Sequence, residues 1–141
     1  MIEIEKLQRL LTHLESTPEE EFCYEEFFPD ILEECNYQNT ISKIEEYQEI
    51  GFPPHTRACI AGHAVMLFPD IDLEAPIYGY THMDVPIATY LGLSDDDRKY
   101  LFFDWGNHTK AAAIHKLKYL IKNGTLSGHV LPDDLKEESC T

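Results

Sequence analysis

The chain has 141 residues, and its 26 acidic against 11 basic side chains give a formal charge of −15 at pH 7. A hydrophobic content of 43% is sufficient for one compact domain and excludes disorder along the whole chain. No stretch approaches the roughly 18 apolar residues that a membrane span requires. The first ten residues lack the basic stretch and cleavage site of a secretory signal, so we expect a cytoplasmic protein.

Apolar residues recur at helical spacing along the chain, and no pair of strands is evident. In chain order, the pattern predicts helices over residues 2–15, 30–34, 41–50, 57–68, 84–90, 95–102 and 110–123. Residues 22–28 fit either a helical turn or a short strand. The expected fold class is therefore all-α, a compact single-domain bundle of six or seven short helices over residues 1–126, followed by a polar C-terminal tail over 127–141.

Residues suited to helix ends support these boundaries. Side chains that can cap a first helical turn precede or begin five of the helices. They are Thr40, Thr56, Asp84, Ser94 and either Asn107 or Thr109. Gly51, Gly92 and Gly124 follow three helices, at the position where a left-handed residue commonly ends a helix. The helix over 57–68 is the most apolar, and its small residues allow close packing, so we expect it at the centre of the bundle.

The charge is unevenly distributed along the chain. Residues 1–50 contain fourteen acidic and three basic side chains, whereas residues 99–141 contain five acidic and six basic ones. Contacts to phosphates need a basic surface, so direct binding to nucleic acid is disfavoured and a basic partner protein is favoured. In the alternative interpretation, the acidic residues only keep the protein soluble.

A set of small and apolar residues recurs in the second half of the chain. The set comprises residues 57–65, Ala88, residues 91–94, Leu101, Phe102, Trp105, Ala111, Ala112 and Ile114. Over residues 53–124 this arrangement resembles a group of short bacterial and bacteriophage proteins with the pattern Cys-Gly-Thr-x-x-Cys-x-x-Gly-His/Trp-Ala, then Leu-Gly-Leu, Leu-Phe and an Ala-rich helix. Pro54 and His55 stand where that pattern has its first Cys-Gly, and residues 30–50 look like an acidic insertion. The resemblance implies a bacterial or bacteriophage origin and the bacterial cytoplasm as location, and it implies no activity.

These features favour a non-enzymatic, phage-encoded protein. We expect its carboxylate-rich N-terminal half to bind and inhibit a basic nucleic-acid-binding or host-defence protein by mimicking nucleic acid. Aromatic residues among the carboxylates are typical interface anchors. The expected partner-binding residues are Glu19, Glu20, Glu21, Tyr24, Glu25, Glu26, Glu33, Glu34, Tyr37, Glu45, Glu46, Tyr47 and Glu49. We expect no cofactor and no catalytic residue, because the common enzyme motifs are absent from the sequence. Self-association through apolar faces is a further alternative.

The sharpest alternative is a zinc-binding domain or metal-dependent hydrolase. His55, Cys59 and His63 are spaced by four residues each, which would place zinc-ligand side chains on one face of a helix. The fourth ligand would come from His82, Asp84 or His108. The competing interpretation makes Cys59 a small packed residue and His63 a hydrogen-bonded core histidine.

Three further groups carry weaker signals. Residues 104–108 combine an acid, an aromatic residue, a glycine and a histidine between two helices, which suits either a general acid or base or an interhelical turn anchored by Trp105. Residues 95–97 are three aspartates that suit a cation site or, more simply, the positive end of a helix dipole. The four cysteines are expected to be reduced thiols, since no C-x-x-C pair or export signal accompanies them.

Overall fold

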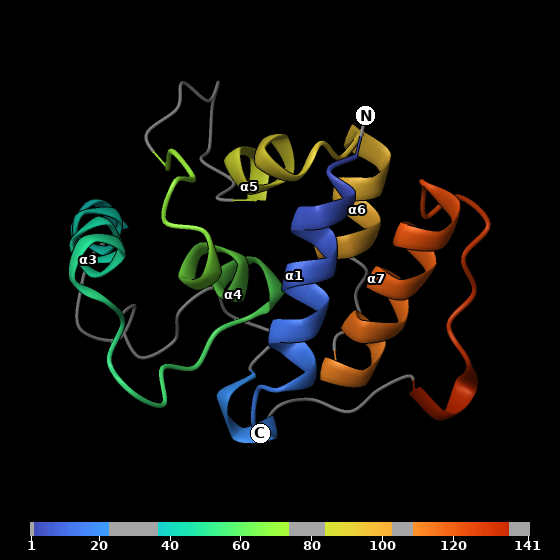
Figure 1. Ribbon diagram of the computed structural model, residues 1–141, viewed down its shortest axis with the longest axis horizontal. Coiled ribbons are helices and arrows are strands. Elements are labelled where there is room, and N and C mark those ends of the chain that lie inside the picture. The colour runs from blue at the N-terminus through green and yellow to red at the C-terminus, as the bar shows by residue number, and fades with distance from the viewer. Residues whose placement is uncertain (1, 23–36, 74–83, 103–108, 136–141) are drawn as a thin grey trace.

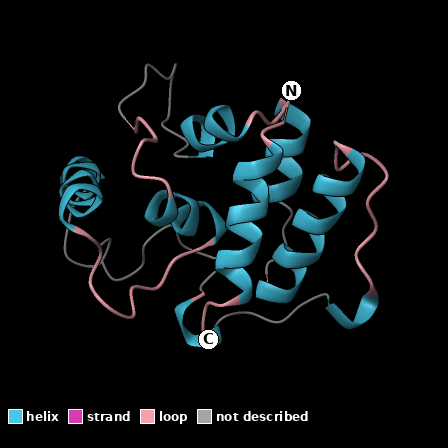
Figure 2. Ribbon diagram, in the orientation of Figure 1, coloured by secondary structure: helices cyan, strands magenta, loops and turns pink. Residues whose placement is uncertain are grey.

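The computed structural model describes residues 2–22, 37–73, 84–102 and 109–135. Within these ranges it contains six α-helices and no strand, so the predicted all-α fold is confirmed (Figures 1 and 2). The helices are α1 (Ile4–Glu15), α3 (Tyr37–Ile50), α4 (Ile60–Leu67), α5 (Asp84–Leu91), α6 (Asp95–Phe102) and α7 (Lys110–Asn123). Two short 3₁₀ turns, η1 (Glu19–Glu21) and η2 (Asp133–Leu135), complete the described elements.

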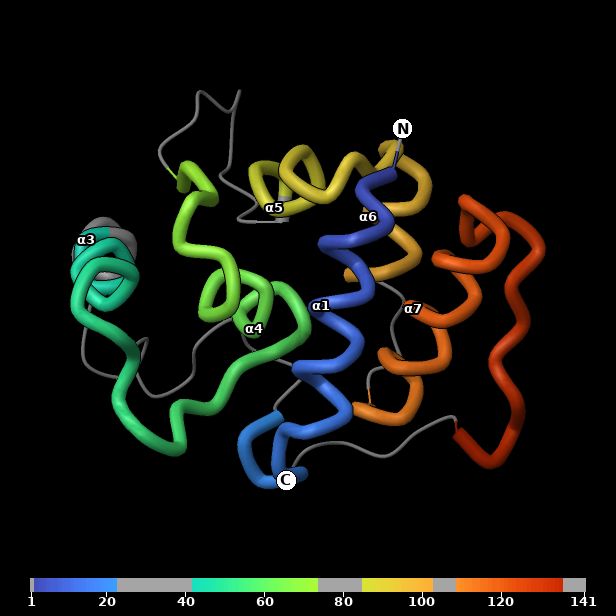
Figure 3. Tube along the Cα trace, viewed as in Figure 1, coloured from blue at the N-terminus to red at the C-terminus, as the bar shows by residue number. Residues whose placement is uncertain are grey.

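Helix α1 occupies the middle of the molecule. It packs along α7 on one side and against α4 on the other, while α5 contacts both α4 and α6 (Figure 1). Helix α3 lies beyond α4, at the opposite end of the molecule from α7 (Figure 3). The most apolar helix was expected at the centre; α4 is indeed buried over residues 60–65, but α1 lies between it and α7.

The core forms because the apolar stripes of these helices face one another. Leu7, Leu10 and Leu14 of α1 are fully buried, and the residues between them are mostly exposed, as the 3.6-residue period requires. Leu117 and Leu120 of α7 complete the same cluster. None of the helices in the described part of the chain is long and apolar enough to cross a bilayer.

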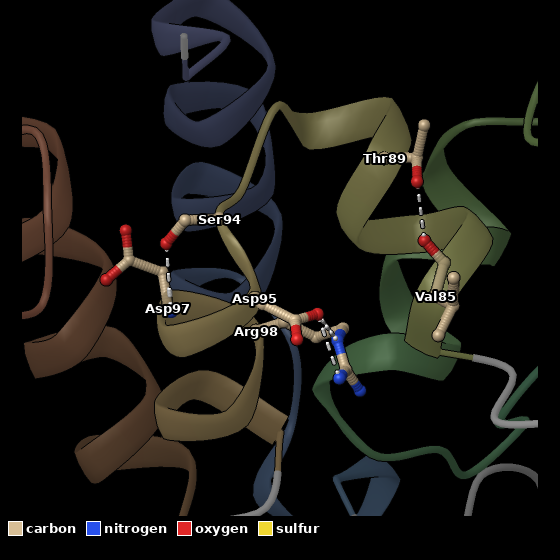
Figure 4. Close-up of polar contacts among 6 residues, drawn as sticks. All are labelled: Val85, Thr89, Ser94, Asp95, Asp97 and Arg98. Carbon is tan, nitrogen blue, oxygen red and sulfur yellow. Dashed lines mark hydrogen bonds and ion pairs between the residues drawn. The ribbon is translucent and has the colours of Figure 1, made fainter.

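Several helix ends agree with the predicted caps. The Ala112 N–H donates to Thr109 Oγ1 at 3.0 Å, which selects Thr109 over Asn107 as the cap of α7. The Asp97 N–H donates to Ser94 Oγ at 3.1 Å at the start of α6 (Figure 4). Gly124 ends α7 in the left-handed region at φ 80°, which a residue without Cβ adopts without strain.

Two predicted helix starts were wrong. Helix α3 begins at Tyr37, three residues before the expected cap Thr40. Helix α4 begins at Ile60 instead of residue 57. The physical reason for the later start is a contact distant in sequence, because Ala58 forms an isolated parallel bridge with Phe22 and must be extended.

The same bridge is the only strand-like pairing in the described ranges, and it lies at the start of the predicted turn or strand over 22–28. The remainder of that segment, the predicted helix over 30–34 and the region of Trp105 lie outside the described residues. Thr56, the expected cap of α4, instead donates its hydroxyl to the Pro53 carbonyl at 2.6 Å.

The segment after α7 packs more closely than its polar sequence indicates. It runs back along α7 toward the start of that helix (Figure 1). Leu126 and Leu131 are buried, and the Thr109 hydroxyl donates to the Leu135 carbonyl at 3.3 Å. Residues 126–135 therefore cover one side of α7.

Candidate functional site

Seven of the predicted partner-binding side chains are described, and they fall in two places. One place is η1, just after the C-terminal end of α1, which contains Glu19, Glu20 and Glu21 (Figure 1). The other is α3, beyond α4, which contains Glu45, Glu46, Tyr47 and Glu49. Tyr37 is the first residue of α3. The other predicted residues, Tyr24, Glu25, Glu26, Glu33 and Glu34, lie outside the described ranges.

Helix α3 has one face held against the rest of the protein. Ile44 is fully buried, and the Gln48 side-chain amide donates to the Ile71 carbonyl at 3.4 Å. Tyr47 is half-buried, with its ring 5.5 Å from that of Phe52. Tyr47 therefore packs within the molecule and presents only part of its surface to a partner.

The other face of α3 is acidic and open to solvent. Glu46 and Glu49 are exposed and three residues apart, so they are neighbours on the helix surface. Lys43 lies 3.5 Å from Glu46, and this carboxylate raises the pKa of the Lys43 ammonium group. Glu45 is half-buried, and Ile50 at the end of the helix is 70% exposed.

The carboxylates of η1 lie close to basic groups of the same chain. Lys110 Nζ donates to the Thr17 carbonyl at 2.7 Å and lies 3.7 Å from Glu19 Oε1. Glu21 Oε2 lies 3.2 Å from His55 Nδ1. Only Glu20 of this turn lacks such a neighbour among the ion pairs of the described residues. Glu46 of α3 also has a basic neighbour, Lys43, so two carboxylates of η1 and one of α3 are paired in this way.

The basic C-terminal part of the sequence is partly internal. Lys116 is 2% exposed and donates to the Tyr100 carbonyl at 3.0 Å. Lys110, described above, is similarly directed at a backbone carbonyl. Lys118 remains exposed and lies 3.7 Å from Glu15. Two of the lysines in this part of the sequence, Lys110 and Lys116, are therefore used inside the fold.

A pair of histidines lies where α1, α4 and η1 meet. His13 Nε2 is 3.0 Å from His63 Nδ1, and His63 Nε2 is 2.8 Å from the Glu21 carbonyl oxygen. The Phe22 ring stacks on the His63 imidazole at 5.7 Å. His63 is 1% exposed, which confirms the interpretation of this residue as a hydrogen-bonded core histidine.

The contacts define the protonation of the neutral pair. A carbonyl oxygen only accepts, so His63 Nε2 carries a hydrogen and His63 Nδ1 accepts from His13 Nε2–H. Burial lowers the pKa of His63 to about 4; the bond to the Glu21 carbonyl opposes this effect, whereas the His13 and Lys110 charges add to it. Burial also lowers the pKa of His13, against the attraction of the Glu21 carboxylate. Both rings are therefore neutral at pH 7.

Sequence reasoning did not identify His13 as part of this cluster. Fifty residues separate it from His63, and no spacing rule relates the two positions. Its place on α1, one residue before the buried Leu14, indicated only that it borders the core.

The predicted zinc site does not form as expected. His55 and Cys59 precede the first residue of α4, so His55, Cys59 and His63 do not share a helix face. Both ring nitrogens of His63 are already engaged, by His13 and by the Glu21 carbonyl. No group of three or more His, Cys, Asp or Glu residues in the described part of the chain is arranged to hold a metal ion. His82 and His108 lie outside that part.

Asp95 and Asp97, two of the three aspartates at the start of α6, point in different directions (Figure 4). Asp95 pairs with Arg98 at 3.1 Å. Asp97 is buried and accepts hydrogen bonds from the Leu126 N–H at 2.8 Å and the Thr125 hydroxyl at 3.0 Å. Asp97 therefore fastens the segment after α7 to α6, which favours the structural interpretation over a cation site.

Comparison with known proteins adds no constraint. No protein-family model, curated protein or solved structure matches the chain.

Proposed function

We propose that the protein is a non-enzymatic interaction protein that binds a basic partner through the acidic face of α3. The observation that carries the proposal is the charge of the first fifty residues, which contain fourteen acids and three bases, together with the exposure of Glu46 and Glu49. Opposite charge speeds association and selects basic surfaces over acidic ones. The partner class that fits is a nucleic-acid-binding or host-defence protein.

A carboxylate row on a helix can occupy a groove that normally holds phosphates. Glu45 and Glu49 are four residues apart, which places them about 6 Å apart along the helix axis and on one side of it. Glu46 widens this row. Occupation of such a groove would block nucleic acid, so the proposed consequence of binding is inhibition by nucleic-acid mimicry.

The first experiment captures the partner from a bacterial lysate at low salt and identifies it. Its affinity is then measured for the wild type, for the Glu46→Lys/Glu49→Lys variant, and for an Asp70→Lys/Asp134→Lys control. All four substituted side chains are exposed, and both variants change the net charge equally. We expect at least about tenfold weaker binding for the α3 variant, equivalent to about 1.4 kcal/mol, and a smaller loss for the control.

The control separates a local surface from overall charge. Equal weakening in the two variants would show that only net charge matters and would contradict a site on α3. A second measurement asks whether the protein competes with nucleic acid for the captured partner. Binding that leaves the partner's nucleic-acid affinity unchanged would contradict the mimicry while leaving the interaction itself intact.

A further inference from the structure

Three segments that are far apart in sequence are joined through one buried side chain. His63 of α4 contacts His13 of α1, 50 residues away, and the carbonyl of Glu21 in η1, 42 residues away. The same carbonyl accepts the Ala58 N–H at 3.2 Å. The Phe22 ring stacks on His63, and Phe22 forms the bridge with Ala58. This corner, made up of η1, Phe22 and Ala58, is thus held in part by what His63 contacts, together with the Lys110 contact to Thr17 and the His55 contact to Glu21.

Protons act on this arrangement in two steps. A first proton on His63 Nδ1 would face His13 Nε2–H, so His13 would have to move its own hydrogen to Nδ1 to keep the 3.0 Å contact. The resulting charge would be buried on a side chain that is 1% exposed. A second proton would leave two donors facing each other, and the bond between the rings would be lost.

Charged groups reach the pair from several elements. Lys110 of α7 adds positive charge, and Glu21 of η1 is the carboxylate that attracts a proton toward His13. That carboxylate is shared with His55, and Lys110 is shared with Glu19. Helix α5 contacts α4 at the other end, where Tyr90 packs on Phe68 and Lys6 lies over the Tyr90 ring. Burial and the charge of Lys110 together oppose a positive charge on the two histidines more than the Glu21 carboxylate favours one.

We propose that the His13–His63 pair is an acid-operated latch. In the neutral form it holds η1 and the Phe22–Ala58 bridge against α1 and α4, and protonation releases this corner while the leucine core between α1 and α7 stays packed. The inference is independent of the proposed binding function, because it concerns how the fold itself responds to acid.

The direction of the pH effect follows from linkage. The pKa of His63 is lowered from 6.5 to about 4 in the closed form, whereas a released histidine regains its ordinary value. Between these two values the open form binds protons that the closed form does not. Opening therefore becomes more favourable as the pH falls, by up to about tenfold per pH unit for one proton.

Hydrogen exchange of single amides tests the latch. The Ala58 N–H reports the corner because its acceptor is the Glu21 carbonyl, and the Leu117 N–H reports the buried core. Protection factors, corrected for the intrinsic rate, are measured from pH 7.5 to pH 4. We expect the protection factor of Ala58 to fall steeply below pH 6.5. The protection factor of Leu117 should remain higher than that of Ala58 over the whole range. Equal protection at both amides from pH 7.5 to pH 4, which would mean that Ala58 exchanges only when the whole chain unfolds, or no decline at Ala58, would overturn a local latch.

Two variants assign the effect to the pair. His63→Gln retains a donor for the Glu21 carbonyl and cannot titrate at this position, so its Ala58 protection should fall less between pH 6.5 and pH 4 than in the wild type, where both rings titrate. The control is His55→Asn, which removes an exposed histidine beside Glu21 and should retain the wild-type profile. Asn suits position 55 because its φ is 65°.

A measurement on the wild type covers the case in which His63→Gln does not fold. Ring resonances of His13 and His63 are followed by NMR over the same pH range. We expect both to titrate below pH 6.5, with the loss of Ala58 protection following the same protons. The proposal would be overturned if His63 titrated with the ordinary pKa of a histidine. It would also be overturned if the Ala58 protection followed the ring resonances of His55 instead.

Discussion

The helices of the core and helix α3 use their side chains in opposite ways. In the core, even polar groups turn inward: Lys116 donates to the Tyr100 carbonyl, and His63 bonds both His13 and the Glu21 carbonyl. On α3, one face anchors the helix and the other presents carboxylates to solvent. Residues that maintain the fold are thus separate from those proposed to bind, so stability and binding can be altered independently.

The largest expected difference between the two regions comes from apolar truncation. Leu117→Ala removes a fully buried side chain from the core and should lower the free energy of unfolding by about 2–5 kcal/mol. Ile50→Ala on α3 truncates a side chain that is 70% exposed and should change it by less than about 0.5 kcal/mol. Urea denaturation of both variants measures the contrast, and similar losses would contradict the division.

Acid should lower the free energy of unfolding through His63. Its folded-state pKa of about 4 lies below the unfolded value of 6.5, so its contribution is complete above pH 6.5 and is lost as the pH falls toward 4. The full contribution of His63 to the free energy of unfolding is about 3 kcal/mol for a pKa shift of this size. Unfolding free energies at pH 7 and pH 4.5 should therefore differ more in the wild type than in His63→Gln. An equal pH dependence in both proteins would refute this role for His63.

Asp97 tests whether the segment after α7 is fastened to the core. Asp97→Ala leaves the Leu126 N–H without its acceptor and should cost about 2 kcal/mol. Asp96→Ala, one residue earlier on the exposed side of α6, is the matched control and should cost less than about 0.5 kcal/mol. Thermal unfolding compares the two. No difference between them would mean that the buried contact contributes nothing measurable.

The smallest expected effect in the core concerns a helix cap. Thr109→Ala removes the acceptor of the Ala112 N–H and should destabilise the protein by about 1 kcal/mol. Thr89→Ala is the control, because the Thr89 hydroxyl only donates back to the Val85 carbonyl within α5 (Figure 4). Thr89→Ala should leave the free energy of unfolding, measured by chemical denaturation, nearly unchanged. The cap assignment does not survive if the two variants behave alike.

Local patterns predicted much of the fold. The leucine spacing of α1, the Ser94 cap of α6, and the Thr109 and Gly124 ends of α7 depend on neighbouring residues, and all appear as expected. The start of α4 could not be predicted in this way. Ala58 is extended because it pairs with Phe22, and no property of residues 54–60 indicates that distant contact.

The candidate site shows the same limit. Counting charges located the acidic part of the chain, but the count treated Lys110 and Lys116 as surface bases although both donate to backbone carbonyls. The regular spacing of His55, Cys59 and His63 suggested a metal site. The actual partner of His63 is His13, which tertiary packing brings to it from α1.

The proposed function is the binding of a basic protein by the acidic face of α3. Its most direct test measures the affinity for the captured partner against salt concentration, for the wild type and for Glu46→Lys/Glu49→Lys. We predict weaker binding and a shallower salt dependence for the variant, with an unfolding free energy within about 0.5 kcal/mol of the wild type. An unchanged affinity and salt dependence in the folded variant would contradict the claim.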